Sequence, residues 1–186
     1  MQGKLFVISG SSGVGKGTLI SKFIEANNNL KLSISVTTRN PRPGEVDGVN
    51  YFYVSEEEFK KSIENNEFLE WAVFSEHFYG TKESFVRKSL EKGMNLILEI
   101  ETQGAFQVRE KIKDAVLIFI LPPSLEELEK RLRGRHTETE EAIQMRLQMV
   151  RNEIEASKEF DYHVVNDNID VALGKLQEIF DKERGI

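Results

Sequence analysis

The stretch ISGSSGVGKGT, at residues 8–18, decides the fold of this chain. The segment KLFVIS at 4–9, which leads into it, is largely apolar with β-branched side chains, as is typical of a buried strand. Beyond it, apolar residues recur at the spacing of a helix, at Leu19, Ile20, Phe23 and Ile24. A strand, a glycine-rich turn and a helix in this order open a parallel α/β unit.

The turn itself nearly matches G-x-x-x-x-G-K-[ST]. Glycines let successive backbone N–H groups converge on phosphate oxygens, and the start of the next helix adds partial positive charge. We predict a loop that binds a nucleoside triphosphate, made of Gly10, Ser11, Ser12, Gly13, Val14, Gly15, Lys16, Gly17 and Thr18. Lys16 would reach the β- and γ-phosphates. Because Gly17 takes the usual hydroxyl position, Mg²⁺ is held by Thr18 or mainly through water; the plain alternative is a glycine-rich turn with a surface lysine.

The rest of the chain alternates strand and helix patterns. We predict further strands at 30–38, 49–55, 67–80, 94–101, 115–123 and 162–167. We predict helices at 15–27, 55–66, 81–93, 102–113, 124–135, 137–160 and 168–185. Ser55 with Glu58, and Ser124 with Glu127, have the spacing of capping boxes. This order predicts an α/β fold whose parallel sheet has helices on both faces, with a small mixed insertion at 39–79.

The composition restricts the class of protein. The 186 residues, 39% apolar and 30% charged, are ordinary for a soluble globular chain. No apolar run approaches about 18 residues, so we expect no spanning helix, and the first residues lack the pattern of an export signal. Cysteine is absent, which fits a reducing cytoplasm. The net charge of −6 argues against broad nucleic-acid binding, so an anionic ligand needs a local basic site.

A second anion site is indicated by the stretch SVTTRNPRPGEVDGVNYFY. It places Arg39 and Arg42 three residues apart in a loop that prolines stiffen, so less entropy is lost when a ligand binds. Together with Tyr51 and Tyr79, these guanidinium groups suit a phosphate monoester. The alternative is a solvated basic loop.

Carboxylate and hydroxyl side chains near strand ends or turns form a further set, namely Ser35, Glu70, Thr81 and Glu101. A carboxylate can accept the adjacent N1–H and N2–H donors of guanine, and a hydroxyl can donate to O6. Adenine presents an acceptor at N1 and would be repelled by the same carboxylate. By spacing alone, a residue of this kind is more often a surface or capping group than a group that contacts the base.

Several segments together resemble guanylate kinase in their order and spacing over nearly the whole chain. They include SVTTRNPRPGEVDGVNYFYVS, NNEFLEWAVFSEHFYGT, LEIETQGA, LPPSLEELEKRLRGRHTETEEAIQMRL and VVNDN. The resemblance implies a P-loop NTPase-type parallel sheet in one domain. Its core would comprise 1–34, 84–121 and 150–186, with a GMP-binding insertion at 35–83 and a helical lid at 122–149.

The resemblance also implies residue roles. The GMP phosphate would be bound by Arg39, Arg42, Tyr51 and Tyr79, and guanine by Ser35, Glu70, Thr81 and Glu101. The transferring phosphoryl group would face Arg131, Arg135 and Arg146, and Asn166 would lie near the adenine of ATP. Catalysis would rest on Lys16, Arg39, Arg135 and Arg146. The family usually has aspartate where this chain has Glu101, so the contact of this longer side chain with guanine is open.

The implied activity is ATP:GMP phosphotransfer that gives ADP and GDP, in cytoplasmic purine metabolism and GMP recycling. It implies Mg²⁺ with ATP, no nucleic-acid or membrane partner, and it admits a homo-oligomer. One alternative is a binding module that has lost catalysis and recognises phosphorylated peptides in the former GMP site. Another is a kinase of the same architecture that acts on a ribose bisphosphate or a different monophosphate.

Overall fold

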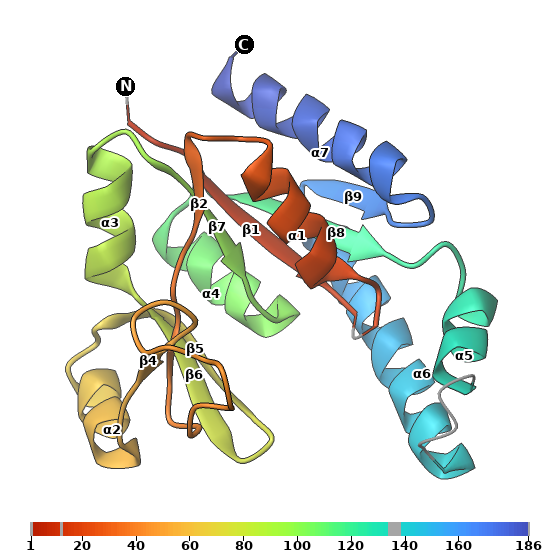
Figure 1. The fold of residues 1–186 in the computed structure, drawn as a ribbon, viewed down its shortest axis with the longest axis horizontal. Helices are drawn as coiled ribbons and strands as arrows, with labels where there is room; N and C mark the ends of the chain where they lie inside the picture. Colours follow the sequence, from red (N-terminus) through yellow and green to blue (C-terminus); the bar gives the residue numbers. More distant parts are fainter. Residues whose placement is uncertain (1, 12, 134–138, 186) are drawn as a thin grey trace.

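The computed structural model describes residues 2–11, 13–133 and 139–185. Within them a parallel sheet has the strand order β2-β7-β1-β8-β9 (Figure 1). Its strands are β1 (Leu5–Gly10), β2 (Leu30–Leu32), β7 (Asn95–Glu99), β8 (Val116–Leu121) and β9 (Tyr162–Val165). The central strand β1 is buried along its whole length, as its apolar sequence predicts. The predicted α/β class is therefore confirmed.

Helices cover both faces of this sheet because side chains of β1 alternate between two cores. Phe6 and Ile8 pack in one cluster with α1 (Lys16–Glu25) and α7 (Ile169–Arg184). Leu5 and Val7 pack in the other with α3 (Glu83–Glu91) and α4 (Thr102–Lys111). Each buried side chain of this size contributes about 1.5–3 kcal/mol of apolar transfer free energy. These two cores fix where β1 ends and α1 begins.

A second sheet has the strand order β4-β3-β6-β5 and lies beside the first. It contains β3 (Val36–Thr37), β4 (Phe52–Tyr53), β5 (Phe68–Phe74) and β6 (His77–Lys82). The helix α2 (Glu56–Glu64) begins at the predicted capping box: Ser55 accepts from Glu58 N, and the Glu58 carboxylate accepts from Ser55 N at 2.8 Å. Phe59 of α2 stacks on Phe68 and closes this small core.

Three of the predicted strands were wrong in extent. The strand predicted at 49–55 is reduced to the two residues of β4. Residues 30–38 form two strands in different sheets, because the chain leaves the first sheet after Ser33, whose N–H donates to Ile97 O, and enters the second at Val36. Residues 67–80 form the hairpin of β5 and β6. Its two-residue turn places Ser75 and Glu76 at φ 47° and 66°, the left-handed conformation that such turns require. Glycine or asparagine usually occupies such positions. Because this turn has serine and glutamate there, the sequence gives no strong indication of a turn.

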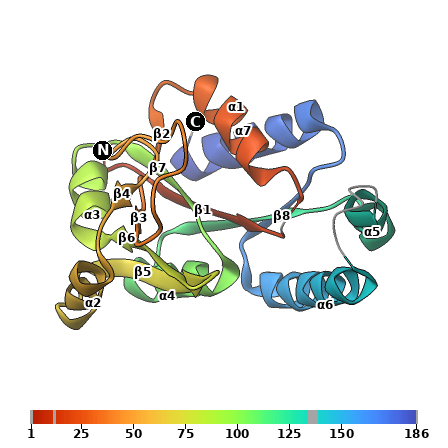
Figure 2. The ribbon, with the colours of Figure 1, turned by 60° about the horizontal axis from the view of Figure 1, so that its bottom comes forward.

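The remaining helices, α5 (Leu125–Arg133) and α6 (Glu140–Ala156), pack on each other through their own apolar cluster. They and the second sheet lie on opposite sides of the main sheet's end (Figure 2). A short 3₁₀ turn (Ser157–Glu159) leads from α6 to β9. Within the described residues, no helix combines the length and apolar character that a bilayer crossing requires.

Candidate active site

The glycine-rich turn joins β1 to α1 at the carboxyl end of the parallel sheet. Gly15 has φ 84°, and a Cβ there would lie 2.8 Å from the amide nitrogen of Asn166, so the position needs glycine. That nitrogen donates to Val14 O at 2.8 Å and ties the loop to the end of β9. The ammonium group of Lys16 donates to Gly10 O at 3.1 Å and thus lies folded over the loop. Ser12 lies outside the described residues.

A cavity of about 400 Å³ begins at Lys16 and extends between the two sheets. From the main sheet it is lined by Leu32 of β2 and Glu99 of β7, and from the second sheet by residues of β5 and β6. It brings together most of the side chains predicted for a monophosphate and its base, namely Ser35, Arg39, Arg42, Tyr51, Glu70, Tyr79 and Glu101. Lys16 of the predicted triphosphate loop and the predicted acceptor site therefore share one cavity.

Glu70 of β5 is the most deeply buried carboxylate of this cavity, at 5% exposure. Thr81, which does not itself line the cavity, donates from Oγ1 to Glu70 Oε1 at 2.6 Å. Burial raises the pKa of Glu70 to about 7, against the opposing effect of its hydrogen bonds with Thr81. On its other side, a Cβ at Gly104 would lie only 2.8 Å from Glu70 Oε2. Any side chain at residue 104 would therefore clash with the Glu70 carboxylate, and glycine avoids this clash.

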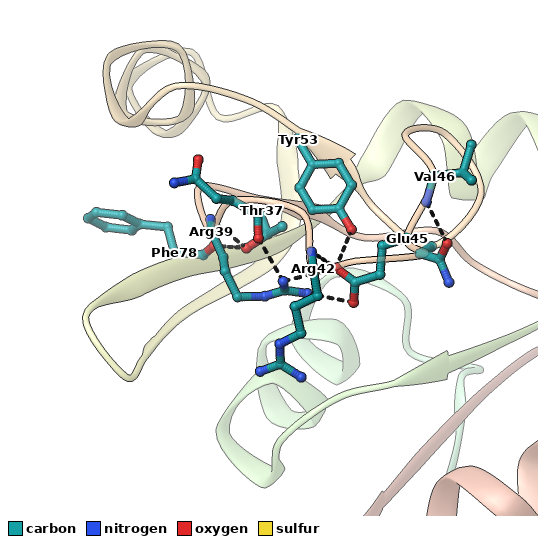
Figure 3. A network of polar contacts seen from close by, with 9 residues as sticks. Thr37, Arg39, Arg42, Glu45, Val46, Tyr53 and Phe78 are labelled. Atoms are coloured by element: carbon teal, nitrogen blue, oxygen red, sulfur yellow. Dashed lines mark hydrogen bonds and ion pairs between the residues drawn. The ribbon is translucent and has the colours of Figure 1, made fainter.

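A network around Glu45 holds the basic loop (Figure 3). Both terminal nitrogens of Arg39 donate to the Glu45 carboxylate at 2.9 Å, and the backbone N–H of Arg42 donates to it at 2.7 Å. The Tyr53 hydroxyl donates to the same carboxylate at 2.8 Å. The Arg39 guanidinium and these donors lower the pKa of Glu45 to about 2. Arg42 extends its own guanidinium away from Glu45 (Figure 3).

Arg39 keeps donors for a ligand in this network. Glu45 and Asn40 O accept three hydrogen bonds from the Arg39 terminal nitrogens, Tyr79 is a further hydrogen-bonding neighbour, and a guanidinium has five N–H groups. The guanidinium carbon Cζ of Arg39 lies 5.4 Å from the ring centre of Tyr51. The Tyr51 ring in turn packs edge-on against Tyr79. The predicted pair of tyrosines therefore stands beside the predicted arginine. Glu45 was missed by the sequence analysis, although it follows Arg42 by only three residues.

Two further carboxylates at the site were not predicted. Glu99 lines the cavity with Lys16 and Glu101, and its Oε1 would lie 3.9 Å from a Cβ at Gly17. Its signal in the sequence was its position two residues before Glu101 on one strand end. Glu153 of α6 is partly buried beside the loop, and burial raises its pKa while the nearby Lys16 lowers it. The amphipathic pattern of that helix gave no signal for Glu153.

The arginines predicted for the lid are described only in part. Arg131 belongs to α5, but its side chain lies outside the described part of the structure, as does the whole of Arg135. Arg146 lies on α6. Arg133, at the end of α5, forms ion pairs with Glu129 at 2.7 Å and with Glu140. The roles of Arg131, Arg135 and Arg146 at the transferring phosphoryl group therefore stay predictions.

A family model described as guanylate kinase matches residues 2–183 of the chain. The chain belongs to the guanylate kinase family. It is 52% identical to the guanylate kinase of Caldanaerobacter subterraneus subsp. tengcongensis over 98% of this chain and 89% of that protein. It is 49% identical to the guanylate kinase of Prochlorococcus marinus strain NATL2A over 94% of both chains.

A solved structure of guanylate kinase from Anaplasma phagocytophilum has the same fold, with a TM-score of 0.78 and 33% identity. The match covers 98% of this chain and 86% of that one. The P-loop NTPase-type architecture predicted from the sequence is thereby confirmed. As a guanylate kinase family member, the chain is a nucleoside monophosphate kinase, a phosphotransferase.

Proposed function

We propose that this protein transfers the γ-phosphate of ATP to GMP and releases ADP and GDP. The observation that supports it best is the shared cavity, which has Lys16 at one end and the Glu70–Thr81 pair in its second-sheet wall. Phosphoryl transfer requires mainly that two anionic nucleotides lie in line and that the charge of the migrating group is balanced. A single cavity that joins Lys16 of the predicted phosphate loop to the predicted acceptor site supports this arrangement.

On the donor side, the loop at 10–18 and the N-terminus of α1 would bind the ATP phosphates, with Lys16 at the β- and γ-phosphates. Asn166 would lie near the adenine, and its bond to Val14 O keeps it next to the loop. The arginines Arg131, Arg135 and Arg146 would close over the transferring group from a lid at 122–149. In this assignment the core comprises 1–34, 84–121 and 150–186.

On the acceptor side, the insertion at 35–83 would bind GMP. Its phosphate would be held by Arg39 and Arg42, whose loop is organised by Glu45, and by Tyr51 and Tyr79, which pack on each other beside Arg39. Guanine would be held by Glu70, with Ser35, Thr81 and Glu101 around it. Thr81 supports this role because its hydroxyl already orients one carboxylate oxygen of Glu70.

Mg²⁺ would bind with ATP beside the first turn of α1. The donor set there fits the ion: Thr18 has an exposed hydroxyl, and the Glu99 carboxylate faces Gly17. Among the described residues, no three His, Asp or Glu side chains gather as a metal site, which agrees with an ion held largely by phosphates and water. When bound, Mg²⁺ balances phosphate charge.

Turnover with a panel of acceptors tests the proposal. We expect the wild-type protein, with MgATP, to phosphorylate GMP with a kcat/KM at least about 10³-fold above those for AMP, CMP and UMP, because only guanine pairs two donors with one carboxylate. Preference for another monophosphate or for a ribose bisphosphate would replace GMP as the acceptor. Phosphopeptide binding without turnover would reduce the chain to a binding module.

The pH dependence of GMP binding gives a second test. GMP requires Glu70 ionised, and the pKa of about 7 in the free protein means that the carboxylate becomes protonated as the pH falls through 7. We therefore expect the dissociation constant for GMP to rise about fivefold from pH 7 to pH 6 through Glu70. The GMP phosphate also titrates near pH 6, so Glu70→Gln provides the control. Calorimetry at several pH values measures how steeply the dissociation constant for GMP rises as the pH falls. This rise should be steeper for the wild type than for Glu70→Gln, and an equal rise would contradict the role of Glu70.

A further inference from the structure

The side-chain amide of Gln107, in α4, forms hydrogen bonds with both backbone polar groups of Trp71 in β5. Trp71 N donates to Gln107 Oε1 at 3.1 Å, and Gln107 Nε2 donates to Trp71 O at 3.0 Å. Strand β5 is an edge strand of the second sheet, so these groups have no neighbouring strand. Gln107 therefore binds the edge of β5 in the way that another strand's peptide group would.

The same short segment of β5 is held on α4 at every residue. One turn beyond Gln107, Lys111 Nζ donates to Phe68 O at 2.5 Å. Leu69 is fully buried in the core that includes Ala105 and Val108 of α4. The Glu70 carboxylate lies against Gly104, as described above. Helix α4 is thus the support on which this part of the GMP-binding insertion rests.

The position of Glu70 depends on this support because the ladder between β5 and β6 is irregular here. The register shifts between Phe68 and Glu70, so regular pairing with β6 begins only at Glu70, opposite Thr81, and the preceding residues are not held in register by β6. In a strand, a slip of one residue turns a side chain to the opposite face. The Gln107 bonds hold Trp71, the residue after Glu70, and so fix the strand at the point where the carboxylate enters the cavity.

We propose that Gln107 is a positioning residue for acceptor specificity, whose amide holds the edge of β5 so that Glu70 meets the N1–H and N2–H donors of guanine. The proposal rests on the proposed function, because it deepens the role of Glu70 in GMP binding. Gln107 acts through the strand, since the residues that line the cavity do not include it. In its absence water can satisfy the exposed Trp71 groups, so the effect falls on geometry rather than on folding.

The test compares GMP with IMP, which lacks the 2-amino group. We expect Gln107→Leu to lower kcat/KM for GMP about tenfold, as suits the loss of two neutral hydrogen bonds, and to leave the KM for ATP within about twofold. The ratio of kcat/KM for GMP over IMP should fall by a similar factor. In a Glu70→Ala background, the same substitution should leave that ratio unchanged, because the carboxylate that it positions is gone.

Trp71 supplies a second readout because it is the only tryptophan of the chain. Acrylamide should quench the Trp71 fluorescence more strongly in Gln107→Leu than in the wild type. Addition of GMP should protect Trp71 from quenching less in the variant than in the wild type. Gln107→Glu, which can accept from Trp71 N but cannot donate to Trp71 O, tests the same bonds if the leucine variant fails to fold. It should lower the GMP over IMP ratio in the same direction.

The matched control is Gln177→Leu. Gln177 also forms one accepted and one donated side-chain hydrogen bond, with Asn27 and Asp181, but it lies on α7. It should change the GMP over IMP ratio by less than about twofold. An unchanged ratio in a folded Gln107 variant, or an equal fall in the Glu70→Ala background, would overturn the positioning role while wild-type turnover of GMP still supports the proposed function. If the wild type fails to use GMP, both fall together.

Discussion

Replacing Lys16 with alanine should lower kcat by about 10²–10³-fold, because one preorganised donor at a developing charge contributes that much in comparable sites. In the structure the Lys16 ammonium lies over the phosphate loop, at 3.1 Å from Gly10 O, and reaches the cavity that holds the predicted acceptor site. The KM for GMP should change by less than the fall in kcat, because Glu70 and Arg39 remain. Steady-state kinetics with MgATP and GMP measure both values.

The control for this prediction is Lys22→Ala. Lys22 is an exposed lysine in the last turn of the same helix, so it tests the loss of a positive charge from α1 without touching the loop. Its kcat should stay within about twofold of the wild type. A Lys16→Ala variant that folds and retains more than a tenth of the wild-type kcat would contradict the assignment of the loop at 10–18 to the ATP phosphates.

The second large effect is expected for acceptor choice. Glu70→Ala should lower the ratio of kcat/KM for GMP over AMP about 10³-fold, because a buried site that pairs with substrate donors discriminates strongly and an alanine cannot pair at all. The GMP over AMP ratio of Glu70→Gln should lie between those of the wild type and Glu70→Ala, because an amide oxygen accepts fewer hydrogen bonds than a carboxylate. The KM for ATP should change little, since Glu70 lies on the insertion and not at the loop.

Glu67→Ala is the matched control for Glu70. Glu67 precedes β5 by one residue, is exposed and pairs with Lys82, so its loss removes a carboxylate from the same region without opening the cavity. The GMP over AMP ratio should stay within about twofold of the wild type. If Glu70→Ala keeps the wild-type ratio, guanine is read elsewhere, and Glu101 becomes the carboxylate to test next.

The sequence predicted most of the main sheet because its signals are local. The apolar run of β1, the glycines of the loop and the helical spacing after Lys16 each act within a few residues. The capping box at Ser55 and Glu58 is equally local, and the structure contains both of its bonds. These elements needed no knowledge of tertiary contacts.

The second sheet was harder to predict because its contacts decide its strands. The chain changes sheets between Leu32 and Val36, and no residue type there marks the change. The turn at Ser75 and Glu76 adopts positive φ without glycine or asparagine, so pairing of the two strands imposes it. Leu69 is buried in the main core because it contacts α4, and the sequence of β5 alone does not indicate this contact.

The same distinction holds at the site. The side chains that line the cavity were predicted through motifs and family resemblance, and the cavity brings most of them together. Glu45 and Gln107 were missed because each acts on another residue, the first on Arg39 and the second on the backbone of Trp71. Such roles depend on distances across the fold, for which spacing in the sequence carries no signal.

Calorimetric titration of the wild type, Lys16→Ala and Glu70→Ala with GMP and with a non-hydrolysable MgATP analogue tests the central claim most directly. We expect Lys16→Ala to lose affinity for the ATP analogue while it keeps GMP binding, and Glu70→Ala to lose GMP affinity while it keeps the analogue. This crossed pattern would show two adjoining sites in one cavity. Loss of both ligands in each folded variant, or binding of neither ligand by the wild type, would contradict the account.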